Sequence, residues 1–102
     1  MARQKFLAAE FSKRFEKSYA GLTAAQQSGV DKAVIARLKR KPTPGMRIKP
    51  IQPDKLYNEA RINDGDRLAH RIENDTLWVV DVVPHDDIDR YGRKVEGLFS
   101  AP

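Results

Sequence analysis

The spacing of the apolar residues changes part-way along the chain, and this change limits what the chain can fold into. Up to "KPTPG" (41–45) apolar residues recur about every four positions, as on one face of a helix. After it they alternate with polar residues, as in a strand with one buried face. Pro42 and Pro44 prevent a helix from continuing through this boundary. The two periods predict an α+β fold, in which a helical hairpin packs on an antiparallel sheet.

The part before the boundary predicts one short strand and two helices. "QKFLAA" (4–9) is expected to form an edge strand. Ser12 is a suitable N-cap for a first helix that ends at Gly21, and Thr23 for a second that runs to about Lys41. The helices are expected to pack through Phe11, Phe15, Tyr19 and Leu22 in the first, and Val30, Val34 and Leu38 in the second, which Gly29 weakens.

The part after the boundary predicts four more strands, at 46–51, 56–62, 66–73 and 76–83. "NDG" (63–65) and "END" (73–75) are expected to form the turns, because Asn, Asp and Gly accept positive φ. The last strand is apolar at nearly every position, so it is expected to be covered on both faces.

Alternation in these strands places cations together on the sheet face that the helices leave open. They are Arg47, Lys49, Arg61, Arg67 and Arg71, with Glu59 and Asp81 on the same side. Such a face is suited to binding a phosphate backbone. The alternative is an ordinary solvated face that the two acids partly neutralise.

Composition excludes several classes of function. The 102 residues suffice for one hydrophobic core, so a single domain over 1–102 is expected. No cysteine occurs, which excludes disulfides, thiolate metal sites and thiol nucleophiles. The start "MARQKF" lacks the apolar region of a signal peptide, and no apolar run is long enough to cross a bilayer. We therefore expect a cytoplasmic protein with no membrane partner.

The net charge of +5 is unevenly distributed. Residues 1–41 contain ten Lys or Arg and three Asp or Glu, a net of +7, whereas residues 42–102 contain nine and eleven, a net of −2. The helical part is therefore basic, and an anionic partner is expected.

The stretch "PHDDIDRY" (84–91) follows the last strand and combines several reactive side chains. Asp86 is expected to cap a short C-terminal helix, with Asp87 and Asp89 in its first turn and Ile88, Tyr91 and Val95 at helical spacing. A metal site is the weaker interpretation, because its carboxylates normally converge from several elements. His85 and Tyr91 can exchange protons beside the basic face, although such residues are more often structural.

Three stretches together resemble the RelE/ParE superfamily of toxins from bacterial type II toxin–antitoxin systems. They are "SKRFEKSYAGL", "GMRIKPI" and "LYNEARINDGDRLAHRIENDTLWVVDVVPHDDIDRY". The resemblance implies a β-α-α-β-β-β fold with a short C-terminal helix. Pro84 and Asp86 differ from the family pattern, in which glycine and a second basic residue are common at these positions.

The resemblance also implies a function. RelE-like members are ribosome-dependent endoribonucleases that cut mRNA. For this chain the resemblance implies an active site made of Lys49, Arg61, Arg67, His85 and Tyr91. It implies no cofactor, and a cognate antitoxin, mRNA and the ribosome as partners. The alternatives are a ParE-like inhibitor of DNA gyrase without catalytic activity, and an inactive relative that only binds nucleic acid.

Overall fold

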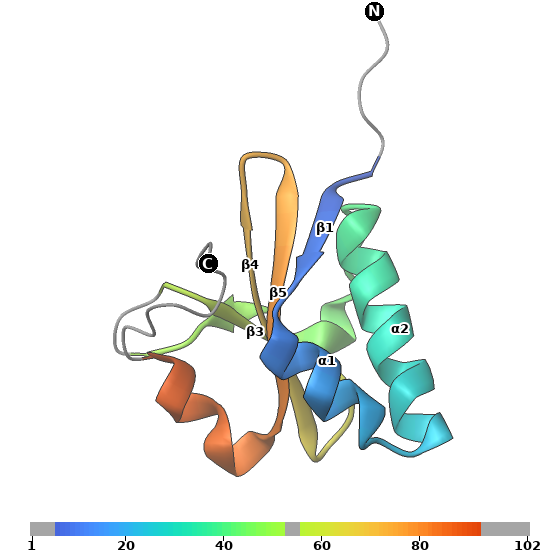
Figure 1. Ribbon diagram of the computed structural model, residues 1–102. Coiled ribbons are helices and arrows are strands. Elements are labelled where there is room, and N and C mark those ends of the chain that lie inside the picture. Colours follow the sequence, from blue (N-terminus) through green and yellow to red (C-terminus); the bar gives the residue numbers. More distant parts are fainter. Residues whose placement is uncertain (1–5, 53–55, 93–102) are drawn as a thin grey trace, which may run out of the picture.

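The chain folds into one sheet with helices on both faces. The computed structural model describes residues 6–52 and 56–92, with side chains described as far as Ile88. The elements are β1 (Ala8–Phe11), α1 (Lys13–Ala20), α2 (Ala24–Leu38), the 3-10 helix η1 (Pro44–Met46), β2 (Lys49–Pro50), β3 (Asn58–Arg61), β4 (Asp66–Glu73), β5 (Thr76–Pro84) and the 3-10 helix η2 (His85–Gly92). Helices α1 and α2 lie on one side of the sheet and η2 on the other (Figure 1). This α+β architecture confirms the fold class expected from the sequence.

The sheet order is β1-β5-β4-β3-β2. Strands β2 to β5 pair with one another in antiparallel fashion, as expected, but β1 pairs with β5 in parallel. β1 is an edge strand, as predicted, but it begins later than 4–9, and residues 4 and 5 lie outside the described part. Strand β5 is an inner strand and is covered on both faces, as its apolar sequence predicted.

The N-caps predicted for the first two helices are confirmed. The Ser12 hydroxyl oxygen accepts a hydrogen bond from the Phe15 N–H at 2.9 Å and donates to the Val80 carbonyl oxygen at 2.5 Å. Thr23 forms a capping box with Gln26, in which each side chain accepts from the other's backbone N–H. Capping of this kind stabilises a helix by about 1 kcal/mol. Ser12 also ties the start of α1 to the sheet.

Two details of the helical part differ from the prediction, and a third adds a role in packing for Gly29. Helix α2 ends at Leu38 rather than near Lys41. Phe11 belongs to β1 and is 42% exposed, and its ring stacks on Phe15 at 5.3 Å between centroids. Gly29 lies where a Cβ atom would meet Ile62 Cγ2 at 3.0 Å. The glycine that weakens α2 therefore allows the helix to approach the loop after β3.

Two expected strand features are wrong. The strand expected at 46–51 is reduced to two residues, because η1 occupies Met46 and Arg47 adopts a left-handed conformation with φ of 46°. The positive φ values expected in "NDG" occur instead in the second turn, at Asn74 (φ 53°) and Asp75 (φ 57°). Two residues with positive φ make the tight turn that joins twisted antiparallel strands.

The sheet separates two apolar cores. The larger core lies under α1 and α2 and includes Phe15, Val30, Leu68 and Val79. The smaller core lies under η2 and contains Ile51, Tyr57, Ala69, Val80, Val83 and Ile88. A β-bulge at Val80 lies between the pairs Ala69–Asp81 and His70–Val79. Successive strand residues face opposite sides, so Val79 and Val80 lie in different cores. The bulge places Asp81, the partner of Ala69, on the same side as Val80 and so interrupts the alternation of β5.

A buried polar contact links α2 to β4. The Arg37 Nε–H donates to His70 Nε2 at 3.1 Å, and His70 Nδ1 lies 3.2 Å from the Leu68 carbonyl oxygen. Arginine only donates, so Nε2 must accept and the proton lies on Nδ1. Burial, and secondarily the Arg37 charge, lowers the pKa of His70 to about 4. Burial also lowers the pKa of Arg37. His70 is therefore neutral in the folded protein near pH 7.

Candidate active site and nucleic-acid interface

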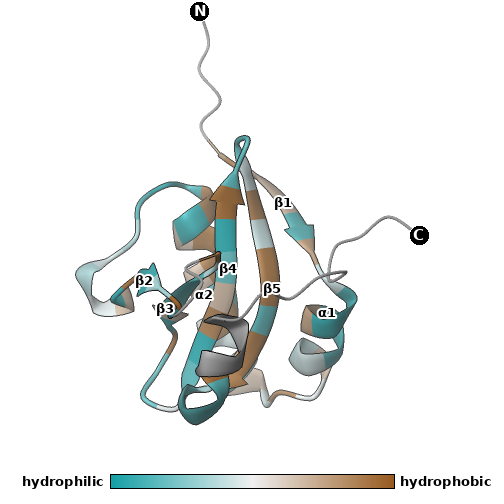
Figure 2. Cartoon of the chain, turned by 90° about the vertical axis from the view of Figure 1, so that its left-hand side faces the viewer, coloured by the Kyte–Doolittle hydropathy of each residue, from teal (hydrophilic) through white to brown (hydrophobic). Residues whose placement is uncertain are grey.

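The candidate site lies on the sheet face opposite α1 and α2, which Figure 2 shows toward the viewer with η2 in front of the strands. Two rows of residues cross this face. Each row is a line of cross-strand partners. The first row runs from Lys49 through Glu59 and Ala69 to Asp81, and the second runs from Arg61 through Arg67 to Val83. The prediction of which strand residues share this face is therefore correct. The face was expected to be open, however, and much of it is covered. Glu59, Ala69 and Asp81 are all buried.

The loop after β3 is held by its own polar groups. The Asn63 side-chain oxygen accepts hydrogen bonds from the N–H groups of Gly65 and Asp66, both at 2.8 Å. Asn63 Nδ2 donates to Asp66 Oδ2 at 2.9 Å. Side chains that bond to nearby backbone groups in this way stabilise a turn without requiring positive φ. The loop is consequently a rigid rim at one end of the sheet.

Arg67 is part of this rim. Its Nη1 donates to the carbonyl oxygens of Asn63, Asp64 and Asp66 at 2.7, 3.2 and 3.0 Å. Its Nε lies 3.8 Å from Glu59 Oε1, and the Arg67 side chain is only 13% exposed. Its position on the polar face of a strand would suggest a small contribution to packing, but the side chain is largely buried. Its guanidinium organises the turn as well as facing the candidate site.

The other two sheet arginines also have acidic partners. Arg61 forms an ion pair with Asp64, and Arg71 forms one with Glu73. The Arg71 guanidinium carbon lies 5.8 Å from the centre of the Tyr57 ring. Arg61 and Arg67 are direct cross-strand partners, and like charges in that position repel unless they are compensated. The acids at 59 and 64 supply this compensation.

The two remaining cations of the predicted set lie at the far edge of the sheet. Arg47 and Lys49 are both exposed. Lys49 is the cross-strand neighbour of Glu59. Within residues 6–52 and 56–88, neither has an ion pair or a side-chain hydrogen bond. They are the cations most accessible to an anionic ligand on this side.

His85 follows β5 and lies next to the rim. Its N–H donates to the Gly65 carbonyl oxygen at 2.8 Å, and the preceding Pro84 pairs with Asp66. The imidazole is 58% exposed, and its Nδ1 lies 3.6 Å from Asp86 Oδ1. The fold thus brings His85, Arg61 and Arg67 to the same end of the sheet, although they are far apart in sequence.

The rest of "PHDDIDRY" is only partly described. Helix η2 begins at His85, so Asp86 and Asp87 lie in its first turn and Asp86 is not the N-cap. Ile88 is buried in the smaller core. Tyr91 lies within η2, but its side chain and that of Asp89 are outside the described part, as is Val95. No group of three or more His, Asp or Glu residues suited to a metal occurs among the described residues.

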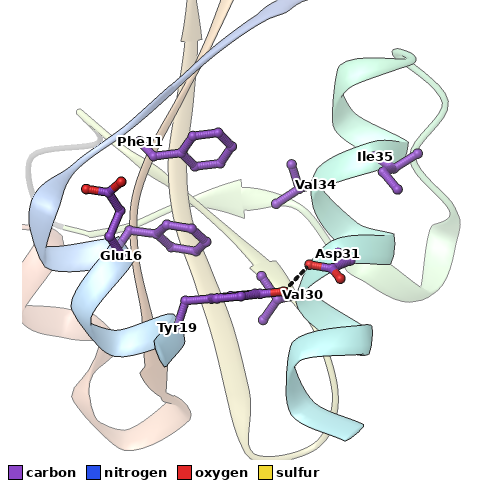
Figure 3. Close-up of a pocket in the computed structure, with 8 residues that line it drawn as sticks. Phe11, Glu16, Tyr19, Val30, Asp31, Val34 and Ile35 are labelled. Carbon is purple, nitrogen blue, oxygen red and sulfur yellow. Dashed lines mark hydrogen bonds between the residues drawn. The ribbon is translucent and has the colours of Figure 1, made fainter. Parts of the chain in front are cut away.

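One surface was missed by reasoning from the sequence. A cavity of about 450 Å³ opens between α1, α2 and the end of β1 (Figure 3). Ile35 lies on its edge and is 48% exposed. The sequence signal for this surface is Ile35, an apolar residue of α2 that lies outside the Val30–Val34–Leu38 stripe.

Comparison with other proteins gives a result at the level of structure. No protein-family model matches the sequence, and no curated protein matches it. Solved structures do match, among them a copper-bound mutant toxin from Helicobacter pylori, with a TM-score of 0.68, 18% identity and coverage of 79% of this chain and 97% of that chain.

Two further matches come from toxin–antitoxin complexes. One is a chain of the RelBE2 complex from Mycobacterium tuberculosis, with a TM-score of 0.62, 19% identity and coverage of 78% of this chain and 99% of that chain. The other is a chain of the DinJ–YafQ complex from E. coli, with a TM-score of 0.66, 15% identity and coverage of 78% and 93%. The chain therefore shares the fold of these structures, as the sequence resemblance predicted.

Proposed function

We propose that this chain is the toxin of a type II toxin–antitoxin system and that it cleaves mRNA on the ribosome without a metal ion. The proposal is supported by the shared fold and, above all, by the position of His85 beside the Arg61–Arg67 pair. A proton-transfer group next to paired cations is what cleavage of a phosphodiester by a 2′-hydroxyl requires.

In the proposed reaction a base removes the 2′-hydroxyl proton of the RNA. The 2′-oxygen then forms a bond to the adjacent phosphorus, the bond to the 5′-oxygen breaks, and an acid gives that oxygen a proton. His85 serves as acid or base, because an imidazole exchanges protons near neutrality. Tyr91 either assists this transfer or stacks on a base.

The cations divide into two groups. Arg61 and Arg67 stabilise the negative charge that develops on the phosphate, because a guanidinium donates two parallel hydrogen bonds to phosphate oxygens. Arg67 also fixes the rim on which Arg61 and His85 depend. The remaining cations bind backbone phosphates of the RNA at positions outside the cleaved bond. They are Arg47, Lys49 and Arg71.

The proposed partners are mRNA, the ribosome and a cognate antitoxin. Several of the matching structures are toxin–antitoxin complexes, and an antitoxin partner is proposed for this chain by analogy. The ribosome is proposed because the described face contains few groups that would align a free RNA for in-line attack. Among the described residues, no helix is long and apolar enough to span a membrane.

One observation favours the alternative of a toxin without catalytic activity. The three sheet arginines all have acidic partners, which reduces the charge available for RNA. A ParE-like inhibitor of DNA gyrase, or an inactive nucleic-acid-binding relative, would not depend on His85. Gyrase supercoiling in the presence of the purified chain tests the first of these directly.

The decisive experiment is cleavage of mRNA in a purified translation system. We expect products with a 2′,3′-cyclic phosphate and a 5′-hydroxyl, and no cleavage of an mRNA with a 2′-deoxy nucleotide at the cut. His85→Gln and Arg61→Gln are expected to reduce the cleavage rate at least about 100-fold. Lys32→Gln, on the exposed side of α2, is the matched control and should cleave normally.

The product ends separate the mechanisms. A 5′-phosphate, or cleavage at the 2′-deoxy position, would exclude attack by the 2′-hydroxyl and return Asp86, Asp87 and Asp89 to consideration as metal ligands. Normal toxicity of His85→Gln together with inhibited supercoiling would instead establish the gyrase alternative.

A further inference from the structure

The rim beside His85 is held by helix α2 as well as by its own polar groups. Gln26, in the first turn of α2, donates a hydrogen bond from Nε2 to Asp66 Oδ2 at 3.3 Å. Three residues further along the helix, Gly29 lies so near the loop that a Cβ atom would meet Ile62 Cγ2 at 3.0 Å. Residues three apart share one face of a helix. This face of α2 therefore contacts both the beginning and the end of the loop.

Asp66 is the residue that connects the rim to this helix. Its backbone N–H donates to the Asn63 side-chain oxygen at 2.8 Å, and its Oδ2 accepts from Asn63 Nδ2 at 2.9 Å as well as from Gln26. Its carbonyl oxygen accepts from Arg67 Nη1 at 3.0 Å and from the Ile62 N–H at 3.1 Å. Asp66 therefore joins the loop, the Arg67 guanidinium and α2 through hydrogen bonds.

The backbone of His85 is attached to the same part of the rim. Asp66 is the cross-strand partner of Pro84, and the carbonyl oxygen of Gly65 accepts from the His85 N–H at 2.8 Å. A shift of Asp66 would therefore change where His85 lies relative to the Arg67 guanidinium. Misplacement of a reacting group by about 1 Å can reduce a catalysed rate by about 100-fold.

We infer that Gln26 is a positioning residue for the candidate active site, because its bond to Asp66 fixes where His85 lies relative to the Arg61–Arg67 pair. The inference rests on the proposed function, in which His85 transfers the proton, and it adds to that site a residue from α2.

The two ends of the Gln26 amide have different roles. Its Oε1 accepts from the Thr23 N–H at 2.9 Å and completes the capping box, whereas its Nε2 reaches Asp66. A glutamate at this position would serve the capping box equally well. Only an amide can also donate to the Asp66 carboxylate, since an ionised carboxylate only accepts. The contact with the rim is therefore separable from the cap by substitution.

Gln26→Glu makes this separation in the full chain. The substitution keeps the cap and places an acid in the first turn of α2, where it is favourable, but it removes the donor to Asp66. We expect single-turnover cleavage of ribosome-bound mRNA to slow about tenfold, with the ribosome concentration at half-maximal rate unchanged. Amide hydrogen exchange at the His85 N–H, measured by NMR, should become several-fold faster, because its bond to Gly65 is held less firmly.

Gln27→Glu is the matched control, with the same substitution one residue later in the same turn. Gln27 Nε2 donates to the Tyr19 carbonyl oxygen at 2.9 Å, so it connects α2 to α1 rather than to the rim. This variant should cleave at the wild-type rate and leave exchange at His85 unchanged. Thermal unfolding of both variants measures the stability that each one loses.

A double-mutant cycle tests whether Gln26 acts through His85. In a His85→Gln background, Gln26→Glu should slow the remaining cleavage by no more than about twofold, because residues that act as a unit are not additive. A tenfold loss in both backgrounds would overturn the inference.

The outcomes distinguish the inference from the proposed function. If the wild-type chain cleaves no mRNA, the proposed function fails and this inference fails with it. If the wild-type chain cleaves and Gln26→Glu cleaves equally fast, or if Gln27→Glu loses as much, Gln26 does not position the site and the proposed function stands.

Discussion

The buried His70 should make the stability of this protein sensitive to mild acid. In the folded chain its pKa is about 4, whereas an exposed histidine has a pKa of about 6.5. The difference of about 2.5 pH units corresponds to about 3 kcal/mol, at about 1.4 kcal/mol per unit. His70 is completely buried, so solvent screening does not reduce this figure substantially.

The sign follows from which state binds the proton more tightly. Because the pKa is lower in the folded state, the stability that neutral His70 contributes is fully present above about pH 6.5. It decreases as the pH falls and has been lost once the pH is below about 4. Near pH 5, His70 alone should lower the free energy of unfolding by about 1.4 kcal/mol for each unit by which the pH decreases.

Urea unfolding at several pH values between 7.5 and 4 measures this dependence. His70→Gln removes the titration but keeps an acceptor for Arg37, so its stability should vary less between pH 6.5 and 4.5. Lys32→Gln is the control, because Lys32 is exposed on α2 and lies outside the contact between Arg37 and His70. An unchanged slope in His70→Gln would refute the reasoning, whatever the absolute stability of that variant.

Three further substitutions test the structure. Arg67→Ala should destabilise the fold by about 2 kcal/mol, because three loop carbonyl oxygens lose their donor. Arg71→Ala should cost less than about 1 kcal/mol, because it removes an ion pair near the surface. Chemical unfolding of the two variants compares these costs. Gly29→Ala should gain less than the roughly 1 kcal/mol of helix propensity in the wild-type chain. It should gain more in an Ile62→Ala background, which lacks Cγ2, and a double-mutant cycle measures this coupling. Ser12→Ala should reduce the free energy of unfolding by roughly 1–2 kcal/mol, because it removes both the cap and the hydrogen bond to β5. The thermal midpoint should fall by several degrees, and an unchanged midpoint would contradict this role.

The candidate site was partly accessible from the sequence. The alternation of β3 and β4 correctly placed Arg61 and Arg67 on one face, and the chain order placed His85 at the exit of β5. Their acidic partners depended on the path of the loop after β3. Asp64 reaches Arg61 only because that loop folds back without positive φ. Side-chain pairing of this kind is not encoded by periodicity.

The sequence by itself determined the local elements, because their causes are local. Ser12 and Thr23 cap helices through bonds that span three residues, and Asn74 and Asp75 tolerate the left-handed turn that joins β4 to β5. Alternation also identified the buried side of each strand, since successive residues of a strand point to opposite faces.

Only the tertiary structure decided how the elements combine. The parallel pairing of β1 with β5 and the bulge at Val80 depend on residues more than 60 positions apart or on different strands. The second core exists because Ile88 of η2 packs on a face that alternation alone would leave to solvent. The cavity beside Ile35 likewise arises from two helices and a strand end that meet only in the folded chain. Contacts between distant segments are selected by the packing of the whole molecule, and no local pattern specifies them.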